Sequence, residues 1–85
     1  MKQGTQIAYI PTHADGDLSH PDVEFGFVVA DRGSSHFCRY WRKDEPGQLR
    51  TLAVSESVST ECLIEHKSVE QVVVRQWLKK LGYEV

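Results

Sequence analysis

The stretch that decides the fold is VEFGFVVADRGSSHFCRYW, residues 23–41. Its two apolar runs, 23–30 and 36–41, are rich in β-branched and aromatic residues, a composition typical of strands. Between them, Asp31-Arg32-Gly33-Ser34 is a sequence that favours a tight turn, because glycine adopts a positive φ at little cost. The stretch therefore predicts a β-hairpin, and Gly26 inside its first strand predicts a bulge or a sharp bend.

Further strands are predicted on both sides of this hairpin. They cover Thr5–Pro11, Leu49–Val54 and Glu61–His66. Residues 12–22, THADGDLSHPD, are rich in Asp, Gly, Ser, His and Pro, and predict a long polar loop that is either functional or only mobile. Residues 42–48, RKDEPGQ, predict a charged loop with a Pro-Gly turn.

The end of the chain has a different periodicity. From Ser68 it reads SVEQVVVRQWLKKLGY, with apolar residues at helical spacing. Ser68 and Gln71 fit a capping box, in which each side chain satisfies a backbone donor of the first turn. Gly82 suits a left-handed stop. A helix over 68–82 is therefore predicted.

Together these segments predict a single domain, 1–85, of the mainly β class. We expect a five-stranded bent antiparallel sheet or an SH3-like small barrel over residues 4–66, followed by one C-terminal α-helix. On strand count, Gly26 and the short strand spacing, residues 4–66 resemble the SH3-like small barrels, which include Tudor and KOW modules. The chain also resembles small uncharacterised bacterial or phage proteins, which implies a phage or mobile-element origin but no activity.

Composition narrows the functional class. The net charge of −2 gives no general attraction to nucleic acid or to acidic membranes. No apolar run is long enough to cross a bilayer, and the N-terminal MKQGTQIAYIP lacks the pattern of a secretory signal. Two cysteines do not make a disulfide framework, so a cytoplasmic protein with reduced thiols is expected.

Metal and catalytic signals are weak. The spacings His36-x-Cys38 and Cys62-x-x-x-His66 place each pair on one face of a strand, and together they form the weak alternative of a zinc site. The alternative is a purely structural role, in which the cysteines are core residues. No metal and no cofactor are therefore expected. The aspartates of the 12–22 loop lack the spacing of a calcium loop, and its two histidines lack a nucleophile context. The chain is not expected to be an enzyme.

An aromatic and basic row is the best binding candidate. It comprises Phe37, Arg39, Trp41, Arg42, Lys43 and Arg50. Alternation places Phe37, Arg39 and Trp41 on one face of the strand, and Cys38 and Tyr40 on the other. If the second face is buried, the first is an exposed platform. If the first is buried, Phe37 and Trp41 are core, which is the more common fate of such residues.

Two functions fit this surface. The first is a small protein-interaction module of unknown partner, since Trp and Arg are frequent in protein interfaces. The alternative is a nucleic-acid-binding small barrel, in which aromatics stack on bases and cations neutralise phosphates. The apolar stripe of the helix is wider than one sheet face needs, so Val69, Val73 and Trp77 are also predicted to pair with a second copy.

Overall fold

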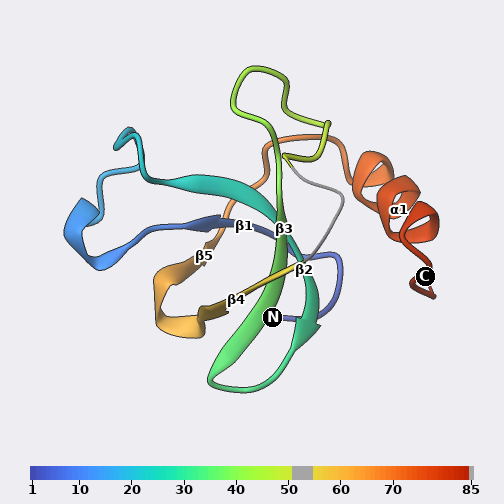
Figure 1. Cartoon of the computed structure of the whole chain (residues 1–85), viewed down its shortest axis with the longest axis horizontal. Coiled ribbons are helices and arrows are strands. Elements are labelled where there is room, and N and C mark those ends of the chain that lie inside the picture. The colour runs from blue at the N-terminus through green and yellow to red at the C-terminus, as the bar shows by residue number, and fades with distance from the viewer. Residues whose placement is uncertain (51–54, 85) are drawn as a thin grey trace.

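A computed structural model describes residues 1–50 and 55–84 of the chain. Figure 1 shows a curved sheet with one helix beside it. The strands are β1 (Gln6–Tyr9), β2 (Glu24–Asp31), β3 (Ser35–Tyr40), β4 (Glu56–Ser59) and β5 (Leu63–Glu65). The helices are two short 3-10 turns, η1 (Thr12–Ala14) and η2 (Thr60–Cys62), and the α-helix α1 (Gln71–Lys80). None of the helices in these two ranges is long and apolar enough to span a bilayer.

The predicted fold class is confirmed. The five strands form one antiparallel sheet in the order β4-β3-β2-β1-β5, which is not closed into a barrel. The two edge strands follow each other in the chain and are joined only by the three residues of η2. Because so short a segment reaches only about 14 Å, the sheet must curve until its edges approach each other.

The central hairpin forms where it was predicted, but its irregularity lies elsewhere. The register between β2 and β3 shifts between Val28 and Ala30, whereas Gly26 pairs regularly with Tyr40. The predicted bulge at Gly26 is therefore wrong in position. Glycine is required there for another reason: a Cβ on Gly26 would lie 1.8 Å from the carbonyl oxygen of Arg39.

The predicted fourth strand, Leu49–Val54, cannot be compared over its whole length. Most of Leu49–Val54 lies outside the described residues, and Leu49 itself makes only an isolated bridge with Trp41. The strand beside β3 is instead Glu56–Ser59, which pairs with Ser35–Cys38. The sequence ESVS was missed because three of its four residues are polar, as suits an edge strand. Within the predicted strand 61–66, residues 61 and 62 belong to η2 and only 63–65 extend the sheet.

Both faces of the central strands are buried. One face packs against α1 in a cluster made of Phe27, Val29, Trp41, Leu49, Val74 and Leu78. The opposite face forms a second cluster made of Ile7, Val28, Cys38, Tyr40 and Leu63. The central strands therefore expose neither face as a free platform.

The start of α1 is held by a partner that is distant in sequence. The predicted capping box is wrong, because the helix begins after Glu70 and no side chain caps it. Instead, the buried Gln6 side chain accepts hydrogen bonds from the backbone N–H groups of Ser68 and Val69. Gln71 donates to the Gly4 carbonyl and accepts from Gln6. The segment before α1 is thus tied to β1 rather than to itself.

The predicted stop at Gly82 is confirmed. Gly82 has φ +92°, and its N–H donates to Lys79. The N–H of Tyr83 donates to the carbonyl of Leu78, so the two bonds form a Schellman motif.

Candidate binding cleft

The aromatic face of β3 is not an exposed platform. Trp41 is 2% exposed, Arg39 is 8% exposed, and Phe37 is half-buried against the cluster under α1. The alternative in which Phe37 and Trp41 belong to the core therefore describes this strand, because α1 covers the face on which they lie.

The remaining basic residues of the predicted row lie at the surface, each with a partner. Arg42 donates to both carboxylate oxygens of Asp44, at 3.0 and 2.7 Å, and this bidentate bond lowers the pKa of Asp44. Arg50 donates to Glu56 at 2.7 Å. Lys43 donates to the carbonyl of Pro21, which fastens the 42–48 loop to the 12–22 loop. The six predicted residues therefore do not form one continuous surface.

The four residues of the zinc alternative are held apart by other contacts. His36 is 1% exposed, and its ring nitrogens lie 2.7 Å from Thr60 Oγ1 and 3.1 Å from the N-terminal amine. Cys38 lies in the cluster on the opposite face from α1, where burial raises the pKa of its thiol to about 11. The His66 ring packs against Phe25 instead. Cys62 is half-buried and free.

A cleft of about 540 Å³ has aromatic side chains in its lining. The residues that line it come from three segments distant in sequence, within 18–25, 41–46 and 66–68, and they do not include every residue of these ranges. Phe25 and Trp41 contribute its aromatic part. Its basic side chains are His20, Arg42, Lys43, His66 and Lys67. No carboxylate stands among the described residues that line it, so we call it the cationic cleft.

The sheet positions the walls of the cationic cleft. Phe25 lies in β2, and its carbonyl accepts the N–H of Trp41 at 2.7 Å, which joins the floor of the cleft to the end of β3. The rings of Phe25 and His66 lie 4.9 Å apart, so the segment after β5 packs on β2. Hydrogen bonds therefore fix the floor, while loops carry the cations.

Two of the cations are partly neutralised by acids outside the cleft. Arg42 is paired with Asp44, and Lys67 Nζ lies 3.4 Å from Glu70. All four side chains of these pairs are exposed, so solvent screens both ion pairs and each stabilises the fold little. An incoming carboxylate can therefore replace either acid at little cost.

The indole of Trp41 adds an unused donor. Its Nε1 is buried and has no acceptor within the described part of the chain. Buried N–H groups are nearly always paired, so an unpaired one calls for an explanation. An acceptor that reached the cleft floor would satisfy this donor.

Sequence reasoning identified part of this cleft and missed the rest. Arg42, Lys43 and Trp41 were in the predicted row, whereas His20, His66 and Lys67 were not placed with them. Their only signal in the sequence is a basic or imidazole side chain beside a predicted strand end. Nothing local indicates that the three segments meet.

The predicted helix interface also has contacts within the chain. Val69, Val73 and Trp77 pack against the cluster under α1, and Trp77 Nε1 donates to the Gly47 carbonyl at 2.7 Å. The helix residue that leaves a large apolar surface exposed is Val72, at 56%.

Comparison with models of protein families, with curated proteins and with solved structures finds no match to this chain.

Proposed function

We propose that this chain is a small non-enzymatic protein-interaction module that binds an acidic segment of a partner protein in the cationic cleft. The carrying observation is the composition of the cleft: its described lining residues include five basic side chains and no carboxylate, on a chain whose net charge is −2. A local excess of cations against the sign of the whole chain favours an anionic ligand at that place.

The floor of the cleft favours a peptide over a simple anion. The half-buried Phe25 offers aromatic surface beside the cations, and interface cores are enriched in aromatic residues and arginine. A volume of about 540 Å³ accommodates a few side chains rather than a large surface. A segment with Asp or Glu next to an apolar or aromatic residue fits both features.

The non-enzymatic part of the proposal is supported by the chemistry of the nucleophile candidates. A thiolate is the reactive form of cysteine, and burial raises the pKa of Cys38 to about 11, which disfavours that form near neutral pH. Two free cysteines also support a cytoplasmic location as part of the same proposal.

The nucleic-acid alternative has less support. Binding of single strands relies on exposed aromatics that stack on bases, and Trp41 is almost fully buried. The exposed cations of the cleft are few, so any such binding should be weak and should fall steeply with salt.

Fluorescence anisotropy with labelled ligands tests the proposal. The ligands are a short peptide in which Asp and Glu flank one Tyr, its Asn and Gln counterpart, and a single-stranded DNA oligonucleotide. We expect saturable binding of the acidic peptide alone. Lys43→Glu and Lys67→Glu should weaken it several-fold, while Arg75→Glu, an exposed charge reversal on α1 away from the cleft, should not.

Three results would contradict the proposal. One is equal affinity for the acidic and the amide peptides, and another is an Arg75→Glu variant as impaired as Lys43→Glu. The third is tight DNA binding at physiological salt, which would favour the nucleic-acid alternative. Affinity capture from native lysate, with and without nuclease, then separates protein partners from those bridged by nucleic acid.

A further inference from the structure

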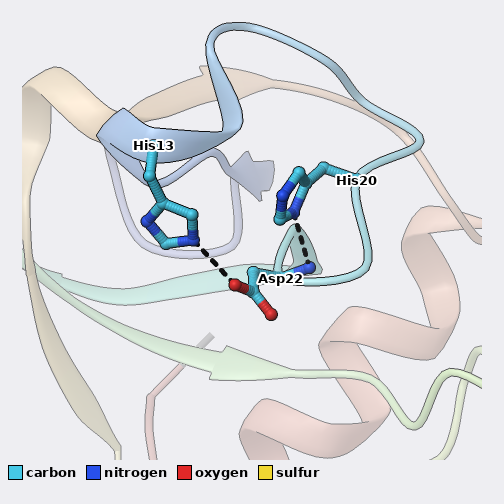
Figure 2. A group of neighbouring side chains, drawn as sticks. All are labelled: His13, His20 and Asp22. Carbon is cyan, nitrogen blue, oxygen red and sulfur yellow. Dashed lines mark hydrogen bonds and ion pairs between the residues drawn. The ribbon is translucent and has the colours of Figure 1, made fainter.

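The loop between β1 and β2 brings together two histidines and an aspartate. His13 lies in η1, whereas His20 and Asp22 lie just before β2, and Figure 2 shows the two imidazole rings on either side of Asp22. One ligand atom of each lies within 4.8 Å of the others. Within residues 1–50 and 55–84, this is the one group of three or more His, Cys, Asp or Glu side chains whose ligand atoms lie that close together.

The loop that carries these side chains is held by its own backbone. The N–H groups of Ala14, Asp17, His20 and Val23 donate to carbonyls three residues earlier, which makes a chain of successive turns. Pro11, Ala14 and Val23 are buried and fasten the loop to the sheet. The side chains of His13 and Asp22 are 63% and 58% exposed, so solutes reach them directly.

The donor set indicates which ligand would fit. Two imidazole nitrogens and one carboxylate oxygen suit borderline divalent ions of the first transition row, zinc in particular. Calcium and magnesium instead prefer shells made only of oxygen. Asp22 supplies the required negative charge, because a carboxyl group is ionised near neutral pH.

We propose that His13, His20 and Asp22 form a binding site for a divalent transition-metal ion, with Zn²⁺ as the best fit. Three protein ligands leave at least one coordination position for water or for a donor from a partner. His20 also lines the cationic cleft, so the proposed metal site lies beside the cleft. The site does not depend on the proposed peptide function and is tested separately.

Binding requires two local hydrogen bonds to be exchanged for metal bonds. His13 Nε2 and Asp22 Oδ2 lie 2.7 Å apart and share a proton, which the ion must displace. His20 Nδ1 accepts the backbone N–H of Asp22 at 3.0 Å. If the ion takes His20 Nδ1, this bond is lost. If it takes Nε2, the proton moves to Nδ1 and the same bond is broken.

Titration of metal-stripped protein with ZnCl₂ in a calorimeter, repeated with CoCl₂ and visible spectroscopy, tests the site. We expect one ion per chain, with amide shifts in an NMR spectrum confined to residues near 12–24. His13→Ala, His20→Ala and Asp22→Asn should each lower the affinity by at least about tenfold, because even changes around a ligand commonly cost that much. MgCl₂ and CaCl₂ should not compete.

Two matched variants keep the test specific. Asp15→Asn removes a carboxylate from the same loop at φ +51°, a conformation that Asn tolerates, and His66→Ala removes an imidazole outside the trio. Both should bind as the native chain does. Lack of saturable zinc binding overturns the proposal. Binding that survives Asp22→Asn and both histidine variants, or that is lost equally in Asp15→Asn, also overturns it.

Discussion

Gln6 and Val69 are joined by two hydrogen bonds between a side chain and a backbone. Gln6 Oε1 accepts the N–H of Val69 at 3.1 Å, and Gln6 Nε2 donates to the Val69 carbonyl at 2.8 Å. Gln6 is 6% exposed, so both bonds are sheltered from water. A primary amide on β1 thus pairs with the segment before α1 as a neighbouring strand would, and fixes where the helix packs.

Replacing Gln6 by Ala should therefore destabilise the fold. The backbone groups of Ser68 and Val69 would lose their partners, and a buried group left unsatisfied costs about 1–3 kcal/mol. Urea denaturation followed by tryptophan fluorescence measures the loss. The control is Gln3→Ala, since Gln3 is exposed and makes one long contact of 3.5 Å. Equal midpoints for the two variants would contradict the role given to Gln6.

Gly26→Ala should be the most damaging glycine substitution. The new Cβ would lie 1.8 Å from a backbone oxygen of β3, and that oxygen moves only if the two strands separate. Gly33→Ala is the control: nothing lies within 4 Å of its Cβ, so only its φ of +85° opposes the change, at about 1–2 kcal/mol. Circular dichroism should show Gly33→Ala folded and Gly26→Ala unfolded or far less stable.

Substitution of Trp77 tests whether the packing of α1 against the sheet stabilises the fold. Its ring is half-buried, contacts Lys80 at 4.9 Å and donates to the loop carbonyl of Gly47. Trp77→Ala should cost about 3 kcal/mol, whereas Trp77→Phe, which removes mainly the hydrogen bond, should cost about 1 kcal/mol. Thermal melts provide the measurement. Unchanged melting in Trp77→Ala would mean that the helix is not part of the core.

The predicted homodimer through Val69, Val73 and Trp77 remains a prediction. Sedimentation velocity over a range of concentrations tests it, with Val72→Lys as the informative variant, since this side chain is exposed and need not affect the monomer fold. A dimer that dissociates in Val72→Lys would support pairing through α1. If the native chain remains monomeric at every concentration, the prediction of a dimer through α1 is wrong.

Acid should weaken the fold partly through Asp31. Hydrogen bonds from the Gly33 N–H and the N-terminal amine lower the pKa of this carboxyl group below 3.8. A carboxyl whose pKa is lower in the folded state stabilises the fold fully above pH 3.8, and this contribution is lost as the pH falls through the lowered value. Unfolding midpoints measured from pH 5 downward should therefore fall less steeply in Asp31→Asn. Parallel curves for the two proteins would exclude this contribution.

Cys38 should be inert toward thiol reagents in the folded chain. Burial raises the pKa of its thiol to about 11, so little thiolate exists at neutral pH, and the side chain is fully buried. With an aromatic disulfide reagent, Cys62 should react first and Cys38 only after denaturant is added. A Cys62→Ser variant isolates the second thiol, and rapid labelling of that folded variant would contradict the assigned burial.

Local chemistry in the sequence determined the hairpin, the helix and its stop. Alternating apolar residues around Gly33 give two strands and a turn within a few residues of one another, and Gly82 ends the helix through its own φ. The same local rules failed at the capping box, because the backbone groups before α1 are satisfied by Gln6, which is more than sixty residues away in sequence.

Only the tertiary structure decided which residues are accessible and which meet. Alternation assigned Phe37 and Trp41 to one face of β3, but the packing of α1 buried that face while the second cluster buried the other. The cationic cleft and the His13, His20 and Asp22 group depend on how the sheet bends and how its loops fold back. The preference of a residue for helix, strand or turn acts over a few neighbouring residues. Which side chains are buried, and which lie close together, depends on the strand order and the curvature of the sheet, and no single segment of the sequence encodes these.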